Sequence, residues 1–84
     1  MSHVIAIHSI SDPDRFWAAV GQTEIPQGTT LHTVLPNDDG TRAVCVWEAD
    51  SADAVKQLVE GTVGDVSSNE FFQVNPQNAQ GLPG

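Results

Sequence analysis

The 84 residues suffice for one domain, and a content of 39% apolar and 17% charged residues is typical of a globular protein. Eleven acidic side chains against three basic ones give a net charge of −8, which opposes binding to nucleic acid and to anionic membranes. The single cysteine excludes an internal disulfide, and the amino-terminal segment lacks the features of a signal peptide or membrane span, so we expect a cytoplasmic protein.

The first third of the sequence predicts a strand followed by a short helix. Residues 3–10 are rich in β-branched side chains, as is usual in strands. Asp12 suits the N-cap of a helix and Pro13 suits its first position, because proline lacks the N–H that would go unpaired there. Gly21 can end this helix, and residues 22–28 then form a connection.

The middle of the sequence predicts a hairpin and a second helix. Residues 29–36 and 41–49 are the expected strands, and the letters NDDG between them supply residue types that hairpin turns favour. The second helix follows at once, with Asp50 or Ser51 as its N-cap. We expect this helix to end at Gly61.

The last third of the sequence predicts one more strand, at residues 69–74, and an extended carboxyl-terminal arm. We therefore expect a domain over residues 1–75 and an arm over residues 76–84, where Pro, Gly and Asn are frequent. The order β-α-β-β-α-β at this length predicts an α+β ferredoxin-like sandwich. Such a fold has an antiparallel four-stranded sheet with both helices on one face.

Apolar side chains occur on both faces of the predicted sheet. In the third strand, Ala43, Cys45 and Trp47 alternate with Val44 and Val46. Two helices on one side cover only one of these faces, and a large exposed apolar face is unusual in a monomer. We expect a second copy of the chain to cover the other face in a symmetric homodimer. The alternative is cover by the carboxyl-terminal arm.

Two histidines and the cysteine lie where the predicted pleat can bring them together. If the hairpin loop has two or four residues, His32 shares a sheet face with Cys45, whereas a loop of three or five residues reverses this assignment. His8 in the first strand could join them. Imidazole and thiolate groups suit zinc or nickel, and they also suit acid–base and nucleophilic chemistry. A buried cysteine is nevertheless usually inert, because apolar surroundings raise its pKa.

Three further residues are candidates for contact with a small molecule. Trp17 can flank a cleft between helix and sheet, and Trp47 combines a large apolar ring with an N–H that needs a partner. Glu48 points to the opposite side of the strand from Trp47, where it could act as a base or a ligand group. If Glu48 is instead structural, we expect it to pair with Arg15 or Arg42.

A set of short motifs runs from Leu31 to Val55 and, more loosely, on to Val74. It consists of the DDG turn, the letters NEFFQV, and the residues Cys45, Glu48, Ala49, Ser51, Ala54 and Val55. The letters GLPG at residues 81–84 are a further motif, beyond this range. These motifs resemble those of small bacterial ferredoxin-like proteins, some of which bind nickel. The resemblance implies a dimeric α+β barrel, and some related dimers are cofactor-free monooxygenases or small-ligand binders.

The leading hypothesis is a homodimer whose clefts bind a small apolar or aromatic molecule through the three contact candidates. No phosphate-binding or dinucleotide-binding motif occurs in the sequence, so we expect no cofactor. An enzyme of this kind would be monooxygenase-like or isomerase-like, with His8 or His32 as the acid–base group. A different hypothesis is a nickel or zinc site made by His8 and His32, with Cys45 or Glu48 as the candidate third ligand. A structural or interaction module without a site is the last alternative.

Overall fold

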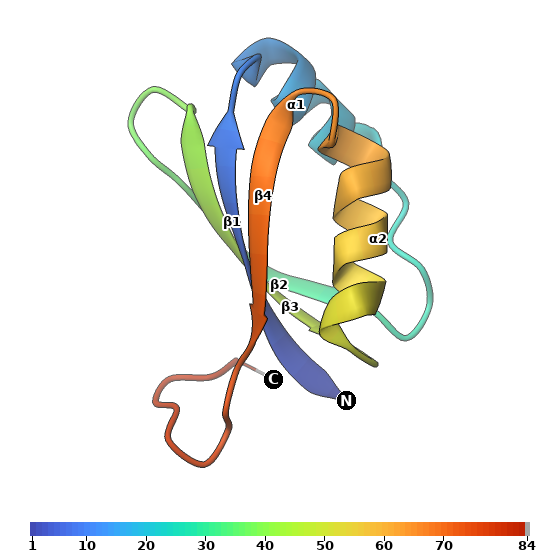
Figure 1. The fold of residues 1–84 in the computed structure, drawn as a ribbon, viewed down its shortest axis with the longest axis vertical. Helices are drawn as coiled ribbons and strands as arrows, with labels where there is room; N and C mark the ends of the chain where they lie inside the picture. The colour runs from blue at the N-terminus through green and yellow to red at the C-terminus, as the bar shows by residue number, and fades with distance from the viewer. Residues whose placement is uncertain (84) are drawn as a thin grey trace.

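The computed structural model describes residues 1–83, and within them the chain forms four strands and two helices. The elements are β1 (Ser2–Ile10), α1 (Pro13–Gln22), β2 (Thr30–Pro36), β3 (Arg42–Ala49), α2 (Ala52–Val63) and β4 (Ser67–Gln73). The strands form one antiparallel sheet in the order β2-β3-β1-β4, with both helices on the same side (Figure 1). This arrangement confirms the predicted α+β ferredoxin-like fold. Neither described helix has the length and apolar character needed to span a bilayer.

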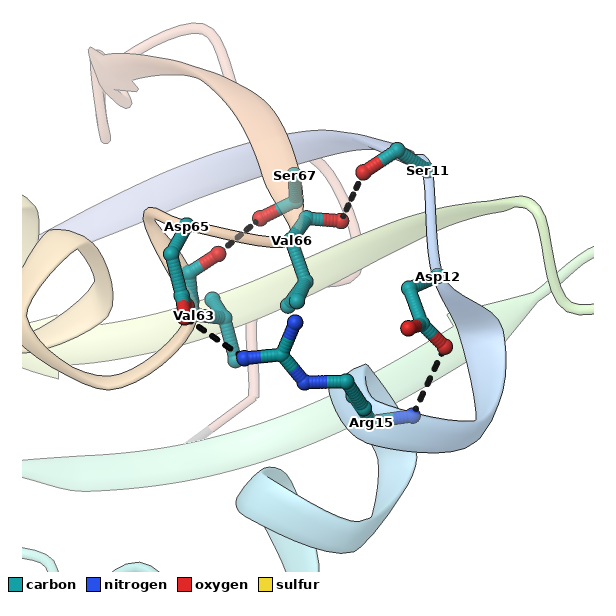
Figure 2. Close-up of polar contacts among 7 residues, drawn as sticks. All are labelled: Ser11, Asp12, Arg15, Val63, Asp65, Val66 and Ser67. Atoms are coloured by element: carbon teal, nitrogen blue, oxygen red, sulfur yellow. Dashed lines mark hydrogen bonds and ion pairs between the residues drawn. The ribbon is translucent and has the colours of Figure 1, made fainter.

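Side-chain contacts join the start of α1 to the connection between α2 and β4 (Figure 2). The carboxylate of Asp12 accepts a hydrogen bond from the backbone N–H of Arg15 at 3.2 Å, which caps the helix as predicted. The guanidinium of Arg15 forms an exposed ion pair with Asp65 at 2.9 Å. The Ser11 hydroxyl donates to the carbonyl of Val66 at 3.0 Å. These contacts fix the first turn of α1 against the chain that leaves α2.

The helix α2 is longer than the sequence indicates. Its N-cap is Ser51, whose hydroxyl accepts a hydrogen bond from the N–H of Ala54 at 3.1 Å. The expected stop at Gly61 is wrong, because the helix continues to Val63 and is capped by Gly64. Val63 is only 2% exposed, and the burial of its side chain outweighs the modest cost of a glycine inside a helix.

The core lies between the helices and the sheet face that they cover. Its buried apolar side chains are Val4, Ala6, Ile10, Phe16, Ala43, Cys45, Trp47, Ala49, Val55, Val59, Val63 and Val66. The β2–β3 turn is joined to this layer by Trp17, whose Nε1–H donates to the carbonyl of Gly40 at 3.1 Å. Gly40 has a φ of +74°, and a β-carbon there would lie 3.0 Å from Trp17 Nε1, so both the turn and the indole require glycine.

The β2–β3 hairpin has an even loop length. The N–H of Asn37 donates to the carbonyl of Arg42 at 2.9 Å, which leaves residues 38–41 as the loop. Val34 consequently pairs with Cys45, in the register that a four-residue loop predicts. Close to the turn, therefore, the assignment of side chains to the two sheet faces follows from the sequence.

Further from the turn, a β-bulge changes that assignment. Leu31 pairs with Trp47 and Thr33 pairs with Val46, so the intervening His32 is an extra residue in β2. The strand alternation is reversed on the far side of the bulge. The prediction that His32 shares a face with Trp47 is therefore wrong, although the loop length on which it depended is correct.

The sheet face away from the helices is apolar, as the sequence indicates, and is called the open face below. Leu35 and Phe72, on its two edge strands, are 57% and 51% exposed. Between them lie four half-buried aliphatic side chains, which are Ile5, Ile7, Val44 and Val46. Leu35 pairs with Val44, and Phe72 pairs with Ile5, so the apolar surface is continuous across the strands.

Candidate functional site

A cavity of about 50 Å³ lies between the helices and the sheet. Its walls come from α1, α2, β1, β2 and β3 and are mostly apolar. Trp17 and Trp47 both line it, together with His8 and Cys45. Ile25, in the connection between α1 and β2, belongs to the wall although 41% of its surface is exposed, so this part of the cavity lies near solvent. The cavity is therefore lined by both of the tryptophans that the sequence singles out as contact candidates.

His8 supplies the imidazole of the cavity wall, and its hydrogen bond determines its tautomer. It is 2% exposed, and its Nδ1 lies 2.6 Å from Oδ1 of Asn69. The amide N–H of Asn69 donates to Glu60 at 3.3 Å, so Asn69 Oδ1 is an acceptor and His8 Nδ1 carries the proton. In the neutral imidazole, Nε2 of His8 then keeps its lone pair and can accept a hydrogen bond.

The two indole N–H groups of the cavity wall differ in their hydrogen bonding. Trp17 donates to Gly40, whereas Nε1 of Trp47 is buried and has no partner among the described residues. Leaving a buried donor unpaired costs about 1–3 kcal/mol, and native structures seldom contain such a group without a reason. Trp47 is 6% exposed, so water outside the protein is not a ready partner. Trp47 lines the cavity, and a bound molecule that reached this N–H would supply its missing partner.

Cys45 lies in the same wall, but its surroundings do not activate it. Burial raises the pKa of its thiol to about 11, so the thiol is protonated at neutral pH. Only the thiolate is a good nucleophile or metal ligand. Cys45 therefore acts as a small apolar side chain of the core, and its predicted role as a metal ligand has no support from its environment.

His32 and Glu48 lie away from the cavity, on the open face. The structure thus separates His32 from His8 and Cys45, which are the other members of the predicted metal site. The physical reason is the bulge, which turns the His32 side chain to the opposite side of β2. Of the two acid–base candidates, His8 lines the cavity and His32 does not. Of the three contact candidates, the two tryptophans line it and Glu48 does not.

His32 and Glu48 instead form a cluster with His3 at the end of the sheet where β1 begins. His3 and Glu48 are direct partners across β1 and β3. Oε1 of Glu48 lies 2.9 Å from Nε2 of His32 and 3.8 Å from Nε2 of His3. The hydrogen bond from His32 and the electrostatic effect of His3 hold the pKa of Glu48 below its ordinary value. The expectation that Glu48 pairs with Arg15 or Arg42 is therefore wrong, because the bulge supplies a nearer donor.

His3 is the member of this cluster that the sequence did not single out. Residues next to a chain terminus usually fray, and His3 carries no motif. Topology is the signal that could have identified it: β1 and β3 are neighbours in a ferredoxin-like sheet, so the start of β1 lies opposite the end of β3. His3 is also held from the carboxyl-terminal arm, since its Nε2 lies 2.7 Å from the carbonyl of Pro83 and donates to it.

Comparisons of the chain with protein-family models, curated proteins and solved structures found no match. What the protein can do is therefore inferred from its own geometry. On the helix side of the sheet, an apolar cavity is lined by His8 and by Trp47, whose indole N–H has no partner among the described residues. On the other side, His3, His32 and Glu48 gather three potential ligand atoms.

Proposed function

We propose that the protein is a homodimer that binds a small, mostly apolar molecule carrying an oxygen acceptor, such as a carbonyl group. The molecule would occupy the cavity between the helices and the sheet. The observation that carries this proposal is the buried N–H of Trp47, a residue of the cavity wall, which has no partner among the described residues. A ligand oxygen at that N–H would satisfy the donor and recover the cost of about 1–3 kcal/mol for leaving it unpaired.

The remaining wall suits both parts of such a ligand. Its apolar side chains would surround a hydrocarbon portion, whose removal from water favours binding by about 25 cal/mol per Å². Nε2 of His8 would accept a hydrogen bond from a hydroxyl group of the ligand. If the bound molecule is a substrate, the same nitrogen is the base. The reaction that these groups support is then a proton transfer that needs no cofactor.

The volume of the cavity limits the size of the ligand. At about 50 Å³ it is a third of the ~150 Å³ that accommodates benzene in an engineered protein cavity. A molecule of a few non-hydrogen atoms fits without rearrangement. An aromatic ring needs more space, which movement of Trp17 and of the exposed Ile25 would provide.

The open face supports the assembly part of the proposal. Leu35 and Phe72 expose about half of their surfaces on it, beside a row of aliphatic side chains. Face-to-face pairing of two copies would remove this apolar surface from water, and the same patch would meet itself across a twofold axis. The resemblance of the sequence motifs to those of dimeric α+β barrel proteins favours the same arrangement.

A nuclear magnetic resonance titration of the two indole N–H groups tests the ligand proposal. Acetone is the probe, and 2-methylpropene, which has a CH₂ group in place of the oxygen, is the matched control. We expect acetone to shift the indole proton of Trp47 downfield, because a new hydrogen bond forms there. Trp17 already donates to Gly40, so its indole proton should not move. The hydrocarbon should leave both indole protons nearly unchanged.

The concentration range follows from the size of the probe. A ligand of four non-hydrogen atoms gains at most about 6 kcal/mol, which corresponds to a dissociation constant of tens of micromolar, so the titration extends through the millimolar range. Trp17→Phe removes one indole signal and thereby assigns the other. An unchanged Trp47 signal at saturating acetone, or an equal response of both tryptophans, would contradict the proposal.

A further inference from the structure

The cluster on the open face suggests a second site, which does not depend on the cavity. We propose that His3, His32 and Glu48 bind a divalent transition-metal ion of the zinc type. Each residue offers one ligand atom, and the three atoms all lie within 4.8 Å of one another. Two imidazole nitrogens and one carboxylate oxygen form a ligand set that zinc and other first-row divalent metals use in proteins.

Three neighbouring strands supply these ligands. The pairing of β1 with β3 sets His3 directly opposite Glu48, and the bulge in β2 brings His32 to the same face. A bulge interrupts the hydrogen-bond ladder, and such irregularities often redirect a side chain beside a functional site. Here the redirected side chain is an imidazole that stacks on a second one, with ring centroids 5.7 Å apart and planes 23° apart.

The distances require little adjustment to hold an ion. With metal–ligand bonds of about 2.0–2.2 Å, two ligand atoms of a tetrahedral site lie about 3.4 Å apart. Oε1 of Glu48 lies 2.9 Å from Nε2 of His32, which is shorter than this spacing. It lies 3.8 Å from Nε2 of His3, which is longer than this spacing. In the single chain the three side chains are between 16% and 27% exposed, so protein supports them while solvent can deliver the ion and a water ligand.

The charges of the chain favour a cation at this place. The net charge of −8 attracts cations, and the Glu48 carboxylate would partly neutralise a bound ion. Among the basic side chains, Arg15 pairs with Asp65, and Arg42 lies at the opposite end of β3 from Glu48. Magnesium is not expected to bind, because it prefers sites built from oxygen ligands alone.

The three histidines of the chain allow a test on the unmodified protein. Two of them belong to the proposed site, and His8 is buried on the helix side of the sheet, where it serves as an internal control. Zinc chloride is added to the full chain without an affinity tag, and the imidazole resonances are recorded. We expect those of His3 and His32 to shift and to saturate at one zinc per chain, while His8 does not move. Magnesium chloride should move none of them.

Substitutions provide the second measurement. Isothermal titration with zinc should show dissociation constants raised at least about tenfold by Glu48→Gln and by His32→Gln, since each removes one of three ligands. Glu70→Gln is the matched control, because Glu70 is exposed, pairs with Ile7 of β1 and carries the same charge as Glu48. It should change the zinc affinity less than about twofold, as expected for screened charge alone. Circular dichroism verifies that each variant folds.

Any of three results overturns the proposal. They are the lack of a saturable response at His3 and His32, a response of His8, or a zinc dissociation constant that Glu48→Gln leaves unchanged. Zinc is the probe because it accepts the tetrahedral geometry that such a ligand set offers, whereas nickel and copper favour square-planar sites. A negative result with zinc does not bear on the ligand proposal that acetone tests, because the cavity lies on the other face of the sheet.

Discussion

Cys45, Trp47 and Glu48 are close neighbours in β3, yet they belong to different parts of the molecule. The pleat directs Cys45 and Trp47 toward the helices and Glu48 toward the open face. They therefore cannot act as one catalytic group, which the alternation of the strand already predicts. The partners of Glu48 could not be predicted in this way, because His3 comes from another strand and His32 depends on a bulge.

The thiol of Cys45 should be unreactive at neutral pH and should affect stability only in alkali. Its pKa of about 11 in the folded protein lies above the ordinary value of 9.0. Because the unfolded chain loses this proton first, the contribution of the thiol to the free energy of unfolding is complete below about pH 9. It is lost as the pH rises toward about 11. Urea unfolding at low and high pH measures the effect.

The comparison that isolates this thiol is between the wild type and Cys45→Ala. The stability advantage of the wild type should shrink between about pH 8 and about pH 10.5. The chain has no tyrosine, and the two proteins differ only at position 45, so the comparison isolates the thiol. An advantage that is the same at both pH values would show that the Cys45 pKa is not raised.

At the scale of single elements, local chemistry predicts how helices and turns begin. Asp12 with Pro13 begins α1, and Ser51 begins α2, because each cap satisfies a backbone N–H without help from the rest of the fold. The end of α2 is different, since it depends on what Val63 contacts. Burial of Val63 in the core favours continuing the helix beyond Gly61, and a single sequence does not reveal that tertiary contact.

Gly61 offers a direct check on the length of α2. It lies inside the helix, has no positive φ, and a β-carbon there would meet no atom within 4 Å. Gly61→Ala should therefore stabilise the protein by about 0.5–1 kcal/mol in urea unfolding. Gly40→Ala is the contrasting variant and should destabilise, because Gly40 has a φ of +74°. A loss of stability in Gly61→Ala would mean that the helix ends there after all.

The bulge in β2 is the reason why the residues that gather at the site could not be predicted from the sequence. The loop length correctly predicts that Val34 lies opposite Cys45, but one additional residue reverses every side chain beyond it. His32 carries no signal such as glycine or proline that marks a bulge. A metal set that includes Cys45 was thus a reasonable inference from the sequence, and the cluster of His3, His32 and Glu48 required the structure.

At the scale of the whole molecule, the order of the elements is sufficient to predict the ferredoxin-like sheet with both helices on one side, but not which of its two faces they cover. The apolar residues of β1 and β3 also indicate a second apolar face, which the structure contains. The cavity was less predictable. Its wall joins five elements, and the lack of a partner for Trp47 among the described residues depends on how all of them pack.

The proposed homodimer makes a prediction about mass in solution. Light scattering at micromolar concentration should give twice the chain mass of 8.9 kDa for the wild type. Val46→Glu should give the mass of a single chain, because it buries a charge at the centre of the open face. Gln57→Glu adds the same charge on the exposed side of α2 and should stay dimeric. A monomeric wild type would refute the assembly.

The contact between His3 and Pro83 connects the carboxyl-terminal arm to the proposed metal site. One imidazole nitrogen cannot donate a proton to a carbonyl and bind an ion at the same time. If an ion occupies the cluster, its binding and the docking of the arm are thermodynamically linked, and each weakens the other by the same factor. The arm would then work as a built-in competitor, so that loading the site with metal detaches the end of the chain.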